Sequence, residues 1–212
     1  MNQIDKNYFN DNKNKQANKV EDILLFDELV LVRIKPNKTS LIWEAIFKSL
    51  PFVLIWAAFD IFFIIMVLST GEAGEMAFFL IPFFLIHLAP VWIYIANIVR
   101  VVAGHKNIEY VFTDRRIILR SGIIGIDYKT INYADVVGLN CKVGLLEKMF
   151  KVGDIHIQAK CQTAILNNIP DPYYYLSKLQ QICLDMKADM AYPNDLRPTT
   201  NHGYKSNYKI DD

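Results

Sequence analysis

Two ionisable residues lie inside the most apolar part of this sequence. Asp60 interrupts the apolar run from Ser49 to Ser69, and His87 interrupts the run from Met76 to Val99. A carboxylate and an imidazole at similar depth can hold or pass a proton, and ionisable residues inside an apolar span are functional candidates by default. Two alternatives need no function: a structural clasp between the two side chains, or a neutral Asp60 bonded to backbone carbonyls freed by nearby prolines.

A set of basic residues downstream of the apolar part is the second candidate site. Its members are Arg115, Arg116, Lys129, Lys142, Lys148 and Lys151. Such a basic rim can face anionic lipid headgroups or a protein partner, at about 1 kcal/mol of attraction per well-placed cation. The alternative is an ordinary solvated strand face, because the net charge is only +1 and nearby acidic residues dilute the field.

The sequence carries none of the usual catalytic signatures. It has no H-E-x-x-H, no G-x-S-x-G, no Walker A motif and no dinucleotide fingerprint. The 3 cysteines include no C-x-x-C pair, and the 4 histidines show no metal-ligand spacing. The GIIG run at 122–125 is read as a turn between strands, because it lacks the helices that flank an RNA-binding GXXG loop. We therefore predict a protein that is no enzyme, with no metal, cofactor or nucleic-acid partner.

The two apolar runs are long enough to position Asp60 and His87 in a bilayer. Each has about the 20 residues that a helix needs to cross the hydrocarbon core, so we predict a transmembrane hairpin with spans at about 49–69 and 76–99. Two buried helices in a soluble protein are the alternative. The connector at 70–75 contains no Lys or Arg, whereas basic residues precede the first run and follow the second. This distribution predicts that both termini are cytoplasmic.

Short alternating segments surround the hairpin. Leu29 to Lys35 is β-branched and ends at Pro36, which is typical of a strand that can join a later sheet. After the hairpin, apolar residues alternate with polar ones in segments that include 108–112, 117–119, 124–128, 137–143 and 155–157. Alternation of this kind predicts antiparallel strands with one face in water. Asp171 and Pro172 then begin a helix whose apolar stripe can cover an open side of the sheet.

These segments give a division of the chain into consecutive parts. We expect a disordered polar leader at 1–22, a strand-like segment at 23–40, the transmembrane hairpin at 41–104, a soluble domain at 105–191 and a disordered tail at 192–212. The two ends are rich in Asn, Lys and Asp, so they cannot bury enough apolar area to offset the entropy of ordering.

The order of these parts resembles a known family. "DELVLVRIKPN", the apolar hairpin, "IEYVFTDRRIILRSGIIG" and "INYADVVGLNCKVGLLEKMFKVGDIHI", followed by an amphipathic helix, are similar to the bacterial membrane-anchored pleckstrin-homology-like proteins of the YdbS type. The resemblance implies an α+β membrane protein: a two-helix hairpin and a cytoplasmic PH-like antiparallel β-sandwich or partly open barrel, capped by the C-terminal helix. The motifs are structural, so they specify a fold rather than a chemistry.

The function expected from this reading is a non-enzymatic binding or assembly scaffold at the cytoplasmic face of the bacterial inner membrane. Its partners would be the lipid bilayer and a protein, or a second copy of itself. One competing hypothesis is a module that senses anionic lipid headgroups through the basic rim. The other is a small transport or proton-relay component that uses Asp60 and His87.

Overall fold

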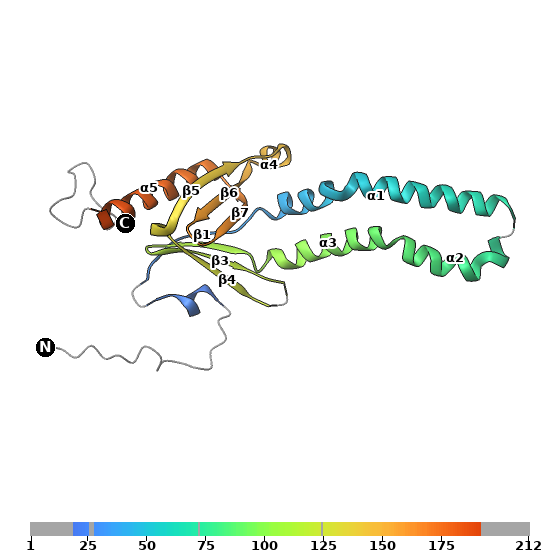
Figure 1. Ribbon diagram of the computed structural model, residues 1–212, viewed down its shortest axis with the longest axis horizontal. Helices are drawn as coiled ribbons and strands as arrows, with labels where there is room; N and C mark the ends of the chain where they lie inside the picture. The colour runs from blue at the N-terminus through green and yellow to red at the C-terminus, as the bar shows by residue number, and fades with distance from the viewer. Residues whose placement is uncertain (1–18, 26–27, 72, 124, 192–212) are drawn as a thin grey trace.

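The computed structural model of the chain describes residues 19–25, 28–71, 73–123 and 125–191. Two antiparallel sheets and a C-terminal helix form a domain, and a long helical hairpin leaves one end of that domain (Figure 1). The α+β fold and the antiparallel sheets agree with the sequence prediction. The predicted tail at 192–212 and most of the predicted leader lie outside the described residues.

The first sheet contains one strand that precedes the hairpin in sequence and three strands that follow it. Its order is β1 (Val30–Ile34), β2 (Glu109–Thr113), β3 (Arg116–Ser121) and β4 (Asp127–Asn132). β1 pairs with β2, with Ile34 opposite Tyr110, so the strand-like segment before the hairpin does join the later sheet. The soluble domain is therefore discontinuous in sequence, and a fragment that begins at residue 105 would lack an edge strand.

The second sheet is closed by the C-terminal helix. Its order is β5 (Val136–Lys142), β6 (Val152–Ala159) and β7 (Thr163–Pro170). Two short helices flank β5: η2 (Tyr133–Asp135) precedes it, and α4 (Leu145–Phe150) joins it to β6. The final helix, α5 (Pro172–Ala191), packs on β5 and β6. The sequence analysis anticipated α5 but neither α4 nor β7.

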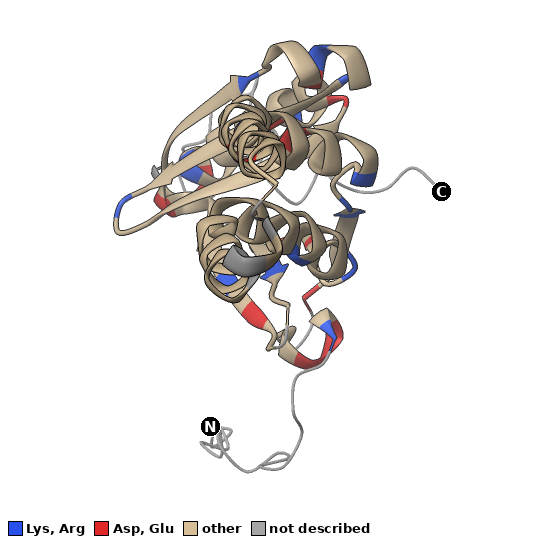
Figure 2. Cartoon of the chain, turned by 90° about the vertical axis from the view of Figure 1, so that its right-hand side faces the viewer, with Lys and Arg blue, Asp and Glu red and all other residues tan. Residues whose placement is uncertain are grey.

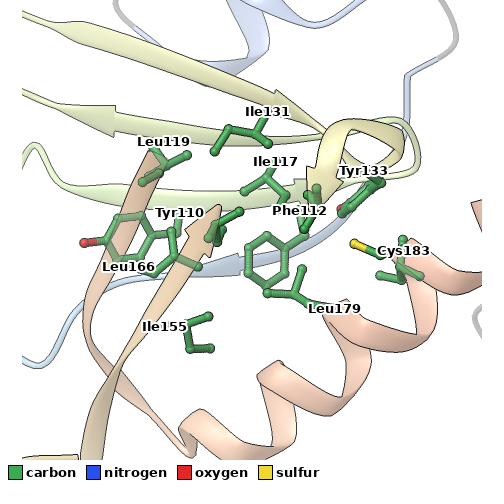
Figure 3. Packing of buried hydrophobic residues seen from close by; sticks show 14 of the residues in the cluster. Tyr110, Phe112, Ile117, Leu119, Ile131, Tyr133, Ile155, Leu166, Leu179 and Cys183 are labelled. Carbon is green, nitrogen blue, oxygen red and sulfur yellow. The ribbon is translucent and has the colours of Figure 1, made fainter. Parts of the chain in front are cut away.

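The core lies between the two sheets and α5. Tyr110, Ile117 and Ile131 from the first sheet meet Ile155 and Leu166 from the second (Figure 3). Leu179, Ile182 and Cys183 of α5 close the cluster, as the helical spacing of its apolar residues predicted. The alternation from 137 to 143 would put Val137 on the apolar face of β5. A bulge between Val136 and Gly138 shifts the register, so Val136 is buried and Val137 is 63% exposed.

The outer face of the first sheet is partly covered instead of facing water. Val111 and Ile118 point away from the main core and are fully buried under Val20. Val20 belongs to η1 (Val20–Ile23), a turn of 3₁₀-helix. Val20 therefore packs on the sheet, although the sequence analysis placed it within the leader at 1–22.

The hairpin contains three helices. They are α1 (Lys38–Ser69), α2 (Ala73–His87) and α3 (Ala89–His105). Only 11% of the most apolar window of α1 is buried. Among the described residues, α1 by itself has the length and composition to cross a membrane, and α2 with α3 would add a second crossing only if the bent pair counts as one span.

Asn168 joins the domain to the start of the hairpin. It is fully buried on β7, and its carbonyl accepts from the Asn37 N–H at 2.9 Å. Its side-chain carbonyl accepts from the Ser40 hydroxyl, and its amide donates to Glu44 at 3.0 Å. Its backbone N–H donates to Asp154 Oδ1 at 2.8 Å. Asn tolerates a φ of +53° better than most residues do. Asn168 therefore adopts the left-handed backbone of this position and also makes the hydrogen bonds that join β7 to α1.

We expect Asn168→Ala to destabilise the chain strongly. The buried Ser40 hydroxyl would lose its partner, at about 1–3 kcal/mol, the partly buried Glu44 would lose a donor, and a left-handed alanine would add strain. The measurement is thermal unfolding of the full chain in mild detergent. Asn140→Ala is the matched control, because Asn140 is exposed on β5. Equal unfolding temperatures for the two variants would contradict the role of Asn168.

Candidate functional site

Asp60 and His87 are in contact across the hairpin. His87 Nδ1 lies 2.6 Å from Asp60 Oδ1, which joins the middle of α1 to the end of α2. Asp60 is only 2% exposed, and its second oxygen, Oδ2, is buried without a hydrogen-bond partner among the described residues. The sequence analysis placed these residues at similar depth, and the structure brings their side chains together.

Aromatic rings hold the His87 imidazole in place. It stacks on Trp56 with centroids 4.9 Å apart and on Phe83 at 5.1 Å, while Phe59 lies at 5.9 Å in a tilted arrangement. Rings around a ring restrict its rotation, so Nδ1 is kept facing Asp60. Packing of these rings therefore holds the imidazole in position for its contact with Asp60.

A break in the helix next to His87 explains a second hydrogen bond at this site. α2 and α3 are bent by 45° around Leu88. Pro90 stands in the first turn of α3, where a missing N–H is tolerated, and the Val91 N–H bonds to Leu88 O rather than to His87 O. The freed His87 carbonyl accepts from Trp56 Nε1 at 2.8 Å.

Trp56 is the residue at this site that the sequence analysis missed. The sequence analysis anticipated backbone carbonyls freed by nearby prolines, but it named Asp60 as their partner and did not consider Trp56. An indole N–H in an apolar span needs an acceptor, and a proline-induced break supplies one. These two signals together would have predicted the contact.

The surroundings of the pair limit what it can do chemically. A cavity of about 410 Å³ between α1 and α2, in the same half of the hairpin, is lined by apolar side chains from Ile64 to Leu88. It provides no polar groups for passing a proton onward. The geometry therefore favours a clasp that fixes the bend of the hairpin over a relay.

The structure separates the predicted basic rim into different places. Arg116 makes a two-pronged ion pair with Glu28, with Nε and Nη2 each 2.9 Å from a carboxylate oxygen, and Nη2 also donates to Ile23 O. Burial alone would raise the pKa of Glu28, but hydrogen bonds, led by that from Arg116, hold this pKa below its usual value. Arg116 is thus a structural residue that ties the segment before β1 to the sheet.

Two further members of the predicted rim, Lys129 and Arg115, lie in environments of their own. Lys129 on β4 donates to the Thr163 carbonyl of β7 and so links the two sheets. Arg115 lies in the β2–β3 turn with its side chain 46% exposed, next to Asp114. Neither residue lies with the lysines around α4.

Lys148 and Lys151 come together beside α5. They line a surface cavity of about 910 Å³ with three consecutive tyrosines, Tyr173, Tyr174 and Tyr175. Tyr173 is 68% exposed and Tyr174 is 59% exposed. Lys142, the last member of the predicted rim, is exposed at the end of β5 just before α4. This part of the rim is the only one that forms a basic and aromatic surface among the described residues.

Charged residues are few on the helical hairpin: α1 contains Lys38, Glu44, Lys48 and Asp60, α2 contains Glu75, and α3 contains Arg100. Viewed along the hairpin, the helices are mostly tan, and most of the blue and red segments lie on the domain behind and around them (Figure 2). No group of three or more His, Cys, Asp or Glu side chains in the described parts of the chain could hold a metal ion.

Comparisons with known proteins address the domain directly. The sequence model of the family described as "Bacterial PH domain" matches residues 49–181, which is more than half of the chain. A solved structure that matches is a DUF1696 family protein with a pleckstrin-homology domain from Shewanella loihica PV-4. It is 15% identical, with 38% of this chain and 70% of that chain covered and a TM-score of 0.29. No curated protein matches the chain.

We expect the effects of Asp60→Leu and His87→Leu on stability to be non-additive. Each single substitution leaves one polar group buried without its partner, and the double variant removes both. The double variant should therefore recover part of the lost stability, with a coupling energy of about 0.5–3 kcal/mol. The measurement is thermal unfolding of the full chain in mild detergent and in bilayers.

The matched control pairs Asp60→Leu with Asn97→Leu. Asn97 is an exposed polar residue of α3, so these two effects should simply add. Additive effects for Asp60 and His87 as well would show that their contact contributes nothing to stability.

Proposed function

Because the chain belongs to the bacterial PH domain family, we propose that it is a non-enzymatic binding module, anchored by its helical hairpin at the cytoplasmic face of the inner membrane. Its partner is a protein, which it holds against the membrane as an assembly scaffold. The observation that carries the proposal is the surface of Lys148, Lys151 and the three tyrosines at 173–175 on a domain attached directly to the hairpin.

The dimensions of α1 support the membrane anchor. Its 32 residues correspond to about 48 Å of helix, which exceeds the roughly 30 Å of the hydrocarbon core. Its apolar side chains are largely exposed, and that exposure is favourable only in lipid or against other apolar helices. The absence of Lys and Arg at 70–75 supports the orientation with both termini in the cytoplasm.

The chemistry of the surface beside α5 supports a protein partner. Exposed tyrosines supply large contact area at low entropic cost, and aromatic residues are typical of the energetic centres of interfaces. Lys148 and Lys151 favour a partner segment that carries acidic side chains. The partner is thus a protein segment with an acidic residue next to an apolar one, or a second copy of this chain.

Sensing of anionic lipid is the second candidate, because Lys142, Lys148 and Lys151 lie around α4. It has weaker support, since Arg116 is paired with Glu28 and Lys129 with a backbone carbonyl. A transport role has less support still, because the cavity near Asp60 and His87 is lined by apolar side chains.

The topology predicts where an impermeant thiol reagent will react. In a background without Cys141, Cys161 and Cys183, a cysteine at Ala73 should be labelled in intact spheroplasts, because the α1–α2 connection would face away from the cytoplasm. A variant that retains only Cys161, which is exposed on the domain, should be labelled only after permeabilisation. Labelling of Cys161 but not of the Ala73 cysteine in intact spheroplasts would exclude this orientation.

The proposed binding surface predicts site-specific cross-linking. A photoreactive amino acid at Tyr174 should give a discrete adduct in living cells, and Lys151→Glu in the same chain should reduce that adduct several-fold. The same amino acid at Leu184 is the control, because Leu184 is 63% exposed on the same helix but does not line the cavity. An adduct of twice the chain mass would identify self-association. Identical adducts from both positions, or none from Tyr174, would contradict a partner at this surface.

A further inference from the structure

The short helix α4 presents an apolar face that nothing in the described chain covers. Leu145 is 88% exposed and Met149 is 76% exposed, and a spacing of four residues puts them on the same side of the helix. Glu147 is buried on the opposite side. Two large apolar side chains at such exposure on a six-residue helix indicate a surface that is covered in the working protein.

α4 lies beside the base of the hairpin. It packs against α1, and Glu147 lies close enough to Glu44 for the two charges to interact. Glu44 precedes the apolar run that begins at Ser49 by about 7 Å of helix. The zone between hydrocarbon and water is about 5–7 Å deep on each side of a bilayer. If α1 crosses the membrane, α4 is therefore at the depth of the lipid headgroups.

A second apolar tip lies at the other leg of the hairpin. Ile123, in the β3–β4 connection, is 45% exposed. The Asn107 amide donates to Gly122 O at 3.1 Å, and a side chain at Gly104 would meet Ile123 at 3.1 Å, so this connection is held against the end of α3. Figure 1 shows α4 and the β3–β4 connection at the end of the domain from which the hairpin leaves.

Cations accompany both tips, and two of the acidic residues near α4 are engaged by the domain, whereas Asp171, beside Lys148 and Lys151, is exposed. Lys142, beside α4, is exposed, and so are Lys48, Arg100 and Lys106 at the base of the hairpin. Glu147 is engaged by the Gly144 N–H, and Glu44 by the Asn168 amide. On the side of β4, Asp127 is an exposed acidic residue. Apolar tips flanked by Lys and Arg match the chemistry of an anionic membrane surface.

We propose that the outer face of α4 and Ile123 form an interfacial seat, which inserts into the headgroup region of the membrane that the hairpin crosses. The occupant of this surface is the phospholipid bilayer, because α4 lies at headgroup depth beside α1, Ile123 lies against the end of α3, and cations flank both tips. The inference rests on the proposed membrane anchor. It adds that the domain is fixed in orientation against the bilayer and does not swing freely on the hairpin.

The test uses the full chain without its native cysteines, reconstituted in vesicles of phosphatidylcholine and phosphatidylglycerol. A single cysteine at Met149 carries an environment-sensitive fluorophore, and separate variants carry it at Leu184 and at Ile65. Leu184 is 63% exposed toward the far end of α5, and Ile65 is 60% exposed within α1. Quenching is measured with aqueous iodide and with lipids that carry a quencher near the headgroup or deep in the acyl chain.

The seat predicts a specific pattern of quenching. The fluorophore at Met149 should be quenched several-fold less by iodide than the one at Leu184, and more strongly by the shallow lipid quencher than by the deep one. Adding Leu145→Glu should raise iodide quenching at Met149 several-fold. Leu145 is exposed and does not belong to the core, so the unfolding temperature of this variant should equal that of the parent chain. An equal unfolding temperature shows that the rise in iodide quenching comes from loss of the seat and not from unfolding.

Failure of the seat and failure of the anchor give different results. If Ile65 is quenched by the deep lipid quencher while Met149 is as open to iodide as Leu184, the hairpin is in the membrane and the seat is wrong. If Ile65 is not quenched by lipid, the anchor itself is wrong, and the seat falls with it. Protection of Met149 from iodide without any quenching by lipid would assign this face to a protein and overturn the proposal.

Discussion

The pairing of β1 with β2 is the constraint on which the architecture depends. These neighbouring strands are separated in sequence by the entire hairpin, yet Ile34 lies opposite Tyr110. The chain must therefore leave the sheet and return to it at adjacent positions, and the two ends of the hairpin are brought together by the hydrogen-bonded ladder. His105 Nε2 meets the Pro36 carbonyl at 2.9 Å where the legs begin and end. The hairpin is an insertion within a sheet, not an appendage on a linker.

If the hairpin lies in lipid as proposed, its apolar helices gain little from burying apolar surface against each other, so its far half needs polar contacts to hold it together. The contacts among Asp60, His87 and Trp56 are of this kind, and they lie at the point where the second leg is broken. Trp56 satisfies the carbonyl released by the break, and Asp60 fixes the side chain of the same residue. One position, His87, is thus held through both its backbone and its side chain. Polar residues in this apolar region are explained by the geometry of the bend.

The sequence was most informative where periodic signals were strong and the contacts local. The strands with alternating residues, the apolar stripe of α5 and the approach of Asp60 to His87 could all be predicted. β7 was missed because its sequence, TAILNNIP, contains two consecutive asparagines that suggest a turn, and Asn168 does adopt a left-handed conformation. The α4 helix is too short to show periodicity. The partner of Arg116 could not be found either, because Glu28 lies 88 residues away and local pattern carries no information on such contacts.

The junction that orients the domain also determines where α4 lies. Burial raises the pKa of Glu147, and the nearby carboxylates of Asp154 and Glu44 raise it further. Asn168 bonds to both of these carboxylates through different donors: its backbone N–H bonds to Asp154, and its side-chain amide bonds to Glu44. Removing the side-chain amide would leave the charge of Glu44 less compensated at the contact between α4 and α1. The residue that attaches β7 to the start of the hairpin thus also bonds to two of the carboxylates beside α4, which couples the position of this helix in the domain to the position of α1.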